Sequence, residues 1–335
     1  MSNTLTRVAV VGCGVISKNH LYALNKLTTV QIVAVCDIVE QKAKDAADAY
    51  GCRYYTDYHE MFVKEKPDVV HICLPHYLHA PVAIEAMEMG IDVLCEKPMH
   101  KDLEGARRMK EVSLRTGRRL GVIFQNRYNS GCRLAKKVLV SGDLGKVKGV
   151  CGTVMWNRDD RYYASGSWRA SYETAGGGVI INQAIHTLDL VRWFADSDVE
   201  DVHATVSHHG ETHAEVEDTA EGVIYFKNGI KGLFFFSINN VCDEQVQVSV
   251  YCEKGKIQIT GTEAVITLNN GEVLESTPSH ETFYGAKSIY GVSHVRQIAH
   301  FYRTGNEAET TMTMEEALKT QELIDMIFKS SAKSD

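Results

Sequence analysis

A buried strand that runs directly into a glycine turn constrains the fold of this chain more than any other feature. Val8 to Val11 is apolar at every position, Gly12-Cys13-Gly14 follows at once, and a helical pattern extends from about Ser17 to Leu27. Apolar side chains on consecutive positions indicate a strand covered on both faces, as in a parallel sheet flanked by helices. The segment therefore predicts the first strand, turn and helix of a doubly wound α/β domain.

The alternation of short apolar strands and helices continues through the first part of the chain. Further strands are expected at Ile32–Cys36, Val69–Leu74, Val93–Cys95 and Leu120–Phe124, with helices between them. Because parallel crossovers are right-handed, these elements predict an N-terminal Rossmann domain over residues 1–125.

From residue 126 onward the pattern favours an α+β domain built on a large open, mostly antiparallel sheet. Strands are expected at Val202–His208, Ala220–Phe226, Gly232–Ile238, Gln245–Cys252 and Lys256–Ile259. A glycine-rich helix start at Ala175–Val179 leads to a helix that is expected to end near Ala195. Phe234-Phe235-Phe236 places apolar side chains on both faces of one strand, and one face then requires cover. We therefore expect residues 126–335 to bind substrate and to form a homo-oligomer, either a dimer or a tetramer.

Composition excludes several classes of partner. The formal net charge of −7 argues against a nucleic-acid partner, and no apolar run approaches the roughly 20 residues that span a bilayer. The first residues lack the pattern of a signal peptide, and the nine cysteines form no CxxC pair, so we expect a cytoplasmic protein. His208, His209 and His213 have no ligand set at metal-binding spacing, which predicts a solvated loop and no metal.

The glycine turn has the features of a dinucleotide site. Gly12 allows a tight turn, Gly14 lets the backbone approach a pyrophosphate, and Ser17 replaces the usual third glycine with a small residue. Asp37 ends the second strand 23 positions after Gly14, near the offset of roughly 20 expected for a ribose-binding acid. Its carboxylate would repel a 2′-phosphate, which favours NAD over NADP; the alternative is that Asp37 caps a loop.

Two polar motifs follow neighbouring strands. The Leu74–His79 segment and Cys95-Glu96-Lys97-Pro98 lie at the carboxyl ends of the third and fourth strands, where doubly wound sheets bind ligands. A lysine beside a nicotinamide would be partly desolvated and near a cationic ring, and both effects lower its pKa towards a useful range. The alternative is that Glu-Lys-Pro is a solvated turn.

Together these motifs resemble the signatures of the Gfo/Idh/MocA oxidoreductases. A second signature matches at Gly176–Asp189, and the resemblance extends through Phe124–Tyr128, Trp168-Arg169 and Tyr290–His294, which is nearly the whole chain. It implies an amino-terminal Rossmann domain and a carboxyl-terminal open-sheet domain.

The resemblance also implies roles for individual residues. Lys97 and His186 match the catalytic groups, and Asn182, His186 and Asp189 are spaced to share one helix face. Asn182 stands where many members have aspartate, a variant that resembles the sugar and nucleotide-sugar 3-dehydrogenase branch. The residues expected at the cofactor are Gly12, Gly14, Val15, Ile16, Asp37, Leu74, His76, His79, Glu96, Lys97, Gln125, Trp168 and Arg169. Those expected at the substrate are Lys97, Arg127, Tyr128, Arg158, Tyr163, Asn182 and His186. The alternatives are a core position for His186 and a surface stacking pair for Trp168 and Arg169.

Three functions are compatible with these residues. The first is an NAD-dependent oxidoreductase that transfers hydride between nicotinamide and a hydroxyl of a sugar or sugar conjugate, with the third carbon as a candidate. The second is an NAD-dependent glycoside-cleaving enzyme that acts through transient oxidation and elimination with the same residues. The third is a non-catalytic dinucleotide-binding regulator, against which the presence of both Lys97 and His186 argues.

Overall fold

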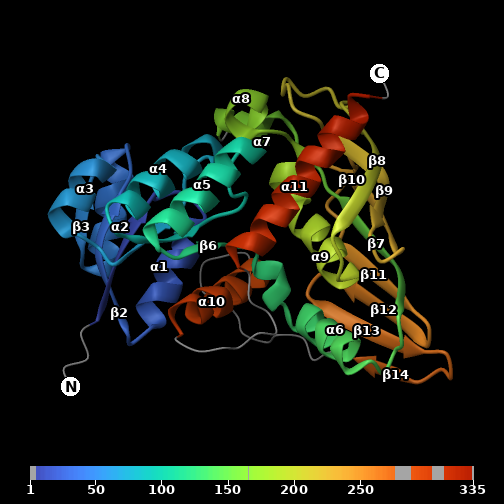
Figure 1. The fold of residues 1–335 in the computed structure, drawn as a ribbon. Coiled ribbons are helices and arrows are strands. Elements are labelled where there is room, and N and C mark those ends of the chain that lie inside the picture. The colour runs from blue at the N-terminus through green and yellow to red at the C-terminus, as the bar shows by residue number, and fades with distance from the viewer. Residues whose placement is uncertain (1–4, 165, 276–287, 304–312, 334–335) are drawn as a thin grey trace.

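The computed structural model describes residues 5–164, 166–275, 288–303 and 313–333, which form two α/β units lying side by side (Figure 1). Side chains at 274–275 and 288–291 are outside this description, so the Tyr290 side chain of the Tyr290–His294 match is not described. None of the described helices combines the length and the apolar character that crossing a membrane requires.

The amino-terminal unit is a parallel sheet with helices on both faces. Its strands, in the order β3-β2-β1-β4-β5-β6, are β1 (Thr6–Val11), β2 (Val30–Cys36), β3 (Arg53–Tyr55), β4 (Val69–Ile72), β5 (Asp92–Cys95) and β6 (Leu120–Val122). The helices are α1 (Ser17–Lys26), α2 (Glu40–Tyr50), α3 (Tyr58–Glu65), α4 (His76–Glu88) and α5 (Leu103–Thr116). The strand order reverses between β1 and β4, so this is the predicted Rossmann topology.

Two elements of this unit were absent from the sequence-based expectation. β3 is three residues long and largely exposed, so it lacks the apolar run that marks the other strands. α3 begins after Asp57, whose side chain accepts the backbone N–H of His59. That capping pattern was the signal that could have identified the helix.

The carboxyl-terminal unit is the predicted open, mostly antiparallel sheet. Its strands, in the order β14-β13-β12-β11-β7-β10-β9-β8, are β7 (Val147–Met155), β8 (Val199–Ser207), β9 (Thr219–Phe226), β10 (Lys231–Ser237), β11 (Gln247–Cys252), β12 (Gly255–Thr260), β13 (Glu263–Leu268) and β14 (Val273–Glu275). β7 and β10 are parallel, and the other neighbouring strands in the described chain are antiparallel. β13 and β14 were not predicted.

Helices cover one face of this sheet and connect it to the first unit. The covering helices are α6 (Ser130–Ser141), α9 (Ile185–Ala195) and α11 (Met314–Ser331), and the connecting helix is α10 (Ser288–Tyr302). α9 packs on β7, and α11 lies along β8 and also contacts α5 (Figure 1). α10 returns to pack on α1 and on the short helix η1 (Gln125–Tyr128), so the last part of the chain joins both units.

The prediction of a single long helix from Ala175 to Ala195 is wrong. The chain forms α8 (Tyr172–Ala175), a π-helix η3 (Val179–Gln183) and then α9. Gly176 has φ +82°, and a Cβ there would lie 1.9 Å from the carbonyl oxygen of Lys101 in the first unit. The glycine run therefore interrupts the helix because it lets two backbones meet at the junction of the units.

A buried ion-pair network fixes α9 against η1 and α11. The Arg127 guanidinium donates to both carboxylate oxygens of Asp189 at 2.7 Å, and both side chains are 1% exposed. Glu316 on α11 accepts from Arg127 at 3.1 Å and from Arg192 at 2.7 Å. Bidentate pairing of this kind stabilises the fold only while every charge keeps its partner.

We predict that Arg127→Met lowers the free energy of unfolding by about 3–5 kcal/mol, because it leaves the buried Asp189 carboxylate short of its main partner. Urea unfolding followed by far-UV circular dichroism measures the change. Arg115→Met, which removes the exposed pair with Glu88, is the matched control and should change stability by less than about 1 kcal/mol. Equal effects of the two substitutions would contradict the assignment.

Candidate functional site

The glycine turn after β1 has the geometry of a phosphate site. Gly12 has φ +93°, and a Cβ there would lie 2.3 Å from the carbonyl oxygen of Cys73, so the position requires glycine. A Cβ on Gly14 would meet nothing within 4 Å, which leaves room for a ligand against the backbone. Ser17 is buried and donates its hydroxyl to the Gly14 carbonyl at 2.7 Å, closing the turn. Ile16, the N-cap of α1, makes no side-chain capping bond, so the first-turn N–H groups can receive phosphate oxygens.

Asp37 lies at the end of β2, beside this turn. Its two oxygens accept backbone N–H groups from Cys13 at 2.9 Å and from Val39 at 2.8 Å. Each carboxylate oxygen retains a lone pair, which suits the two hydroxyls of a ribose. Val15 and Ile38 are 87% and 90% exposed and place apolar surface next to the site. The residues present therefore fit an adenosine dinucleotide.

Lys97 leaves the end of β5 and reaches across to the second unit. Its Nζ donates to the backbone carbonyl of Asn182 at 2.8 Å. Burial lowers the pKa of Lys97 to about 8, with a further lowering by Arg169 and a partial offset by the negative charge of Glu96. A lysine with this pKa can give or take a proton near neutral pH.

His186 comes from α9 on the other side of the junction. Burial, followed by the nearby charge of Lys97, lowers the pKa of His186 to about 3, so the ring is neutral. Its Nε2 lies 3.2 Å from Nε2 of Gln125. Within the described residues, Nδ1 of His186 and Oε1 of Gln125 are buried without a hydrogen-bond partner. Buried polar atoms are normally satisfied, so these two indicate where a ligand completes the site.

The segment after β7 adds aromatic and cationic groups. Trp168, in η2 (Ser167–Ala170), packs edge-on against His76 with ring centres 4.6 Å apart. The Arg169 guanidinium lies 4.5 Å from the Trp168 ring centre, and its charge acts on both His76 and Lys97. His76 bonds through Nδ1 to the carbonyl of Ala175 at 2.7 Å, so α4 is also tied to the second unit.

A tyrosine that the sequence reasoning missed contacts the predicted site. The Tyr162 hydroxyl accepts from the side-chain amides of Asn182 at 3.2 Å and Gln183 at 3.0 Å. Tyr163 was expected instead, but it is 6% exposed and packs in the core. Both lie in α7 (Asp160–Ala164), so the choice between them depends on a helix rotation that adjacent positions do not reveal.

Several predicted contacts lie elsewhere. Arg127 pairs with Asp189, and Tyr128 is 5% exposed with its hydroxyl 3.1 Å from Nδ1 of His300, so both side chains expected at the substrate bond to other protein groups. Asn182 lies in η3, whereas His186 and Asp189 lie in α9, so the three residues do not belong to one helix as expected.

Three other residues that were predicted at the site, His79, Leu74 and Arg158, contact the loops around it. Both ring nitrogens of His79 lie 2.8 Å from backbone carbonyls, those of Pro98 and Leu74, so this side chain joins the two strand-end loops. Leu74 itself lies beside Gly12. Arg158 forms an ion pair with Asp243 at 2.8 Å and stacks 5.6 Å from the Tyr162 ring centre.

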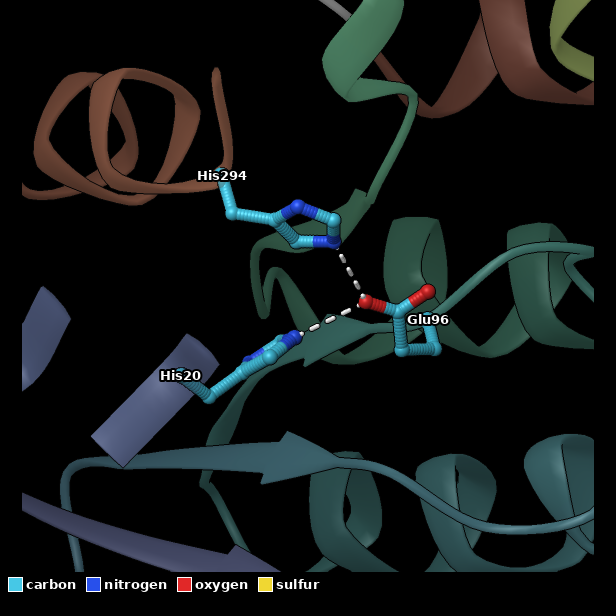
Figure 2. Close-up of side chains that lie close together, drawn as sticks. All are labelled: His20, Glu96 and His294. Carbon is cyan, nitrogen blue, oxygen red and sulfur yellow. Dashed lines mark hydrogen bonds and ion pairs between the residues drawn. The ribbon is translucent and has the colours of Figure 1, made fainter. Parts of the chain in front are cut away.

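The Glu96 side chain, which was expected at the cofactor, bonds to two histidines. Figure 2 shows its carboxylate between His20 of α1 and His294 of α10.

Two family models match this chain. Residues 6–124 match an oxidoreductase family with an NAD-binding Rossmann fold, and residues 132–258 match the GFO/IDH/MocA C-terminal domain.

Two curated relatives are similar over most of their length. Inositol 2-dehydrogenase of Salmonella typhimurium is 28% identical over 257 residues, which cover 76% of this chain and 73% of that protein. D-glucoside 3-dehydrogenase of Escherichia coli K12 is 28% identical over 295 residues, which cover 82% of both. Among solved structures, the WlbA dehydrogenase of Bordetella pertussis in complex with NADH and UDP-GlcNAcA is 27% identical. It aligns with a TM-score of 0.84 over 99% of this chain and 98% of that chain.

We predict that Asp37→Ser lowers the ratio of kcat/KM for NAD over NADP at least about tenfold, because it removes a negative charge from the position of the 2′-phosphate. Steady-state rates with both cofactors measure the ratio. Asp57→Ser is the matched control, because the Asp57 carboxylate also accepts the N–H two residues ahead but caps α3. An unchanged ratio in Asp37→Ser would show that this carboxylate does not bind the ribose hydroxyls.

Proposed function

The chain belongs to the Gfo/Idh/MocA family of NAD-binding oxidoreductases, and from this membership we propose that its substrate is a ring hydroxyl of a sugar, polyol or sugar conjugate. The three relatives named above act on or bind an inositol, a glucoside and a nucleotide sugar acid, according to their names. A cyclic polyhydroxy ring is common to these compounds. The third carbon is the position we favour, since the glucoside dehydrogenase is named for it.

The observation that carries this proposal is that Lys97 reaches across the junction of the units and its charge acts on His186. The Lys97 ammonium is held by the carbonyl of Asn182, four positions before His186 in the chain. The unpartnered Nδ1 of His186 supplies a second polar atom in the same region. An alcohol oxygen bound here would have a cation and a neutral imidazole available.

These charge states suggest how the two residues share the reaction. NAD, when bound, supplies the acceptor for the hydride. The neutral His186 ring accepts the hydroxyl proton at Nδ1. This requires the N–H to be on Nε2 and the Gln125 amide to present its oxygen there, an orientation that exchanges the two interchangeable amide positions. The very low pKa of His186 in the free protein rises when a partner stabilises the protonated form. Lys97 donates a hydrogen bond to the same oxygen and stabilises the negative charge that develops as the proton leaves.

Lys97→Met is expected to reduce turnover by at least about 100-fold while the Kd for NAD changes little, because the charge is needed at the reacting oxygen. Stopped assays for NADH and fluorescence titration with NAD measure the two quantities. Lys101→Met, four residues further along, is the control and should keep its activity, since the Lys101 ammonium pairs with Asp102. Retained activity in Lys97→Met would refute the role.

A substrate screen tests the proposed function itself. Sugars, sugar acids, polyols, glycosides and nucleotide sugars are incubated with NAD while absorbance of NADH is followed. Accumulation of NADH with a cyclic polyol or sugar supports the proposal. Release of aglycone with catalytic NAD would indicate glycoside cleavage, and tight NAD binding with no turnover of any class would indicate a regulator.

We also propose that the open face of the carboxyl-terminal sheet forms a homo-oligomer. Leu233 is 49% exposed and Phe235 is 41% exposed on β10, although Phe234 and Phe236 between and beside them are buried. Tyr251 and Val265, on β11 and β13, are also exposed large side chains of this sheet. An apolar face of this kind requires cover.

The double substitution Leu233→Lys and Phe235→Lys is predicted to reduce the oligomer to monomers, because two charges would then be buried in the interface. Light scattering coupled to size-exclusion chromatography measures the mass. Val63→Lys, at another exposed apolar position, is the control and should leave the mass unchanged. A monomeric unsubstituted protein would contradict the proposal.

A further inference from the structure

A continuous row of buried polar side chains leads away from the residue that precedes Lys97. Oε1 of Glu96 lies 2.9 Å from Nε2 of His20 and 3.2 Å from Nε2 of His294 (Figure 2). Nδ1 of His20 lies 2.8 Å from Nδ1 of His71, and Nε2 of His71 lies 2.8 Å from the Tyr302 hydroxyl. The groups come from α1, β4, the end of β5 and α10, so four separated parts of the chain build the row.

The positions of the protons in this row follow from its acceptors. Burial lowers the pKa of His20 and lowers that of His71 well below its usual range, so both rings are neutral with one N–H each. If Tyr302 donates to His71, His71 donates to His20, and His20 donates to Glu96, every hydrogen bond has one donor and one acceptor. This direction requires Oε1 of Glu96 to be an acceptor, which a carboxylate provides.

The surroundings of Glu96 agree with that charge state. Burial raises the pKa of its carboxyl group, but the hydrogen bonds from His20 and His294 outweigh burial and hold the pKa well below the usual range. Its other oxygen, Oε2, lies 3.3 Å from the backbone N of Lys97 and accepts that N–H. Glu96 is therefore an anion fixed beside the active-site lysine.

The groups around Lys97 have opposite effects on its pKa. His76 on α4, Arg169 on η2 and His186 on α9 share its electrostatic environment, and the Arg169 charge favours loss of the lysine proton. Glu96 is the acid that acts against burial to keep Lys97 protonated. Removal of that charge would leave Lys97 with influences that mainly favour the neutral amine.

We propose that His20, His71, His294 and Tyr302 are positioning residues that hold Glu96 as a carboxylate, and that this fixed anion keeps Lys97 protonated at the reacting oxygen. The role of protonated Lys97 at the reacting oxygen rests on the proposed function. In this arrangement the Glu96 carboxylate is held by His20 and His294 and by the backbone N–H of Lys97.

A metal ion is the other occupant that these side chains could accept. Ligand atoms of His20, Glu96 and His294 lie within 4.8 Å of one another, and two histidines with one glutamate form a known zinc set. However, Nε2 of His20 and Nε2 of His294 both lie at hydrogen-bond distance from Oε1 of Glu96. Two donors and one acceptor then satisfy all three side chains without a metal ion. We therefore favour the hydrogen-bonded row.

The test measures the Lys97 pKa directly, without turnover. Lysines are dimethylated with ¹³C-formaldehyde, the Lys97 signal is identified by its loss in Lys97→Met, and its pKa is followed by NMR. Glu96→Gln should lower that pKa by about one unit, because an opposite charge next to the amine is lost. His20→Leu should lower it in the same direction, and His20→Gln, which restores an N–H donor, should bring it back towards the original value.

His59→Gln is the matched control, because His59 also pairs with a glutamate, Glu85, but on the surface of the same unit. It should leave the Lys97 pKa unchanged. An unchanged pKa in Glu96→Gln, or a stoichiometric divalent metal found by mass spectrometry in the purified protein, would overturn the inference.

The pH dependence of kcat/KM gives the catalytic readout. Because Lys97 acts as the protonated form, activity falls as pH rises through its pKa, and this alkaline limb should move to lower pH in Glu96→Gln. A shifted NMR pKa in a protein that turns over no substrate would refute the proposed function and leave the role of the row intact.

Discussion

The properties of the candidate site depend on one interaction, the contact of the Lys97 ammonium group with the second unit. Lys97 belongs to the Rossmann sheet, yet its Nζ bonds to a backbone carbonyl of the second unit. That contact is possible because the glycine run at Gly176 brings the backbone against Lys101 and ends the preceding helix. Burial of the charge lowers the lysine pKa, and the same burial keeps His186 neutral. The electrostatic properties of the site therefore follow from the packing of the units.

Periodicity along the sequence was sufficient to predict the two sheets and the glycine turn. Buried strands such as Val8–Val11 are apolar at every position, and their signal does not depend on distant residues. β3 and β14 are three residues long and have no such signal, which is why they were missed. β13 was missed although Ala264 and Ile266 are buried, because only alternate positions of this strand enter the core. The helix expected from Ala175 to Ala195 failed because a contact with Lys101, remote in sequence, determines the backbone at Gly176.

Prediction of the site was limited by side-chain direction. Gln125, Arg127 and Tyr128 occupy one short helix and were all expected near the ligands, but only Gln125 contacts His186 among these three described side chains. Arg127 faces inward because Asp189 and Glu316 compensate its charge, and neither partner can be identified from local spacing. A charged residue in a polar motif is therefore ambiguous until its counter-ions are located.

The buried ion-pair network around Arg127 affects when the second unit can fold during synthesis. Arg127, Asp189 and Arg192 are synthesised well before Glu316, the acid on α11 that contacts both arginines. Without that acid the buried group carries two positive charges and one negative charge. The second unit therefore reaches charge balance only after its last helix has left the ribosome and docked, so shortening α11 would affect a cluster whose other members lie more than a hundred residues earlier.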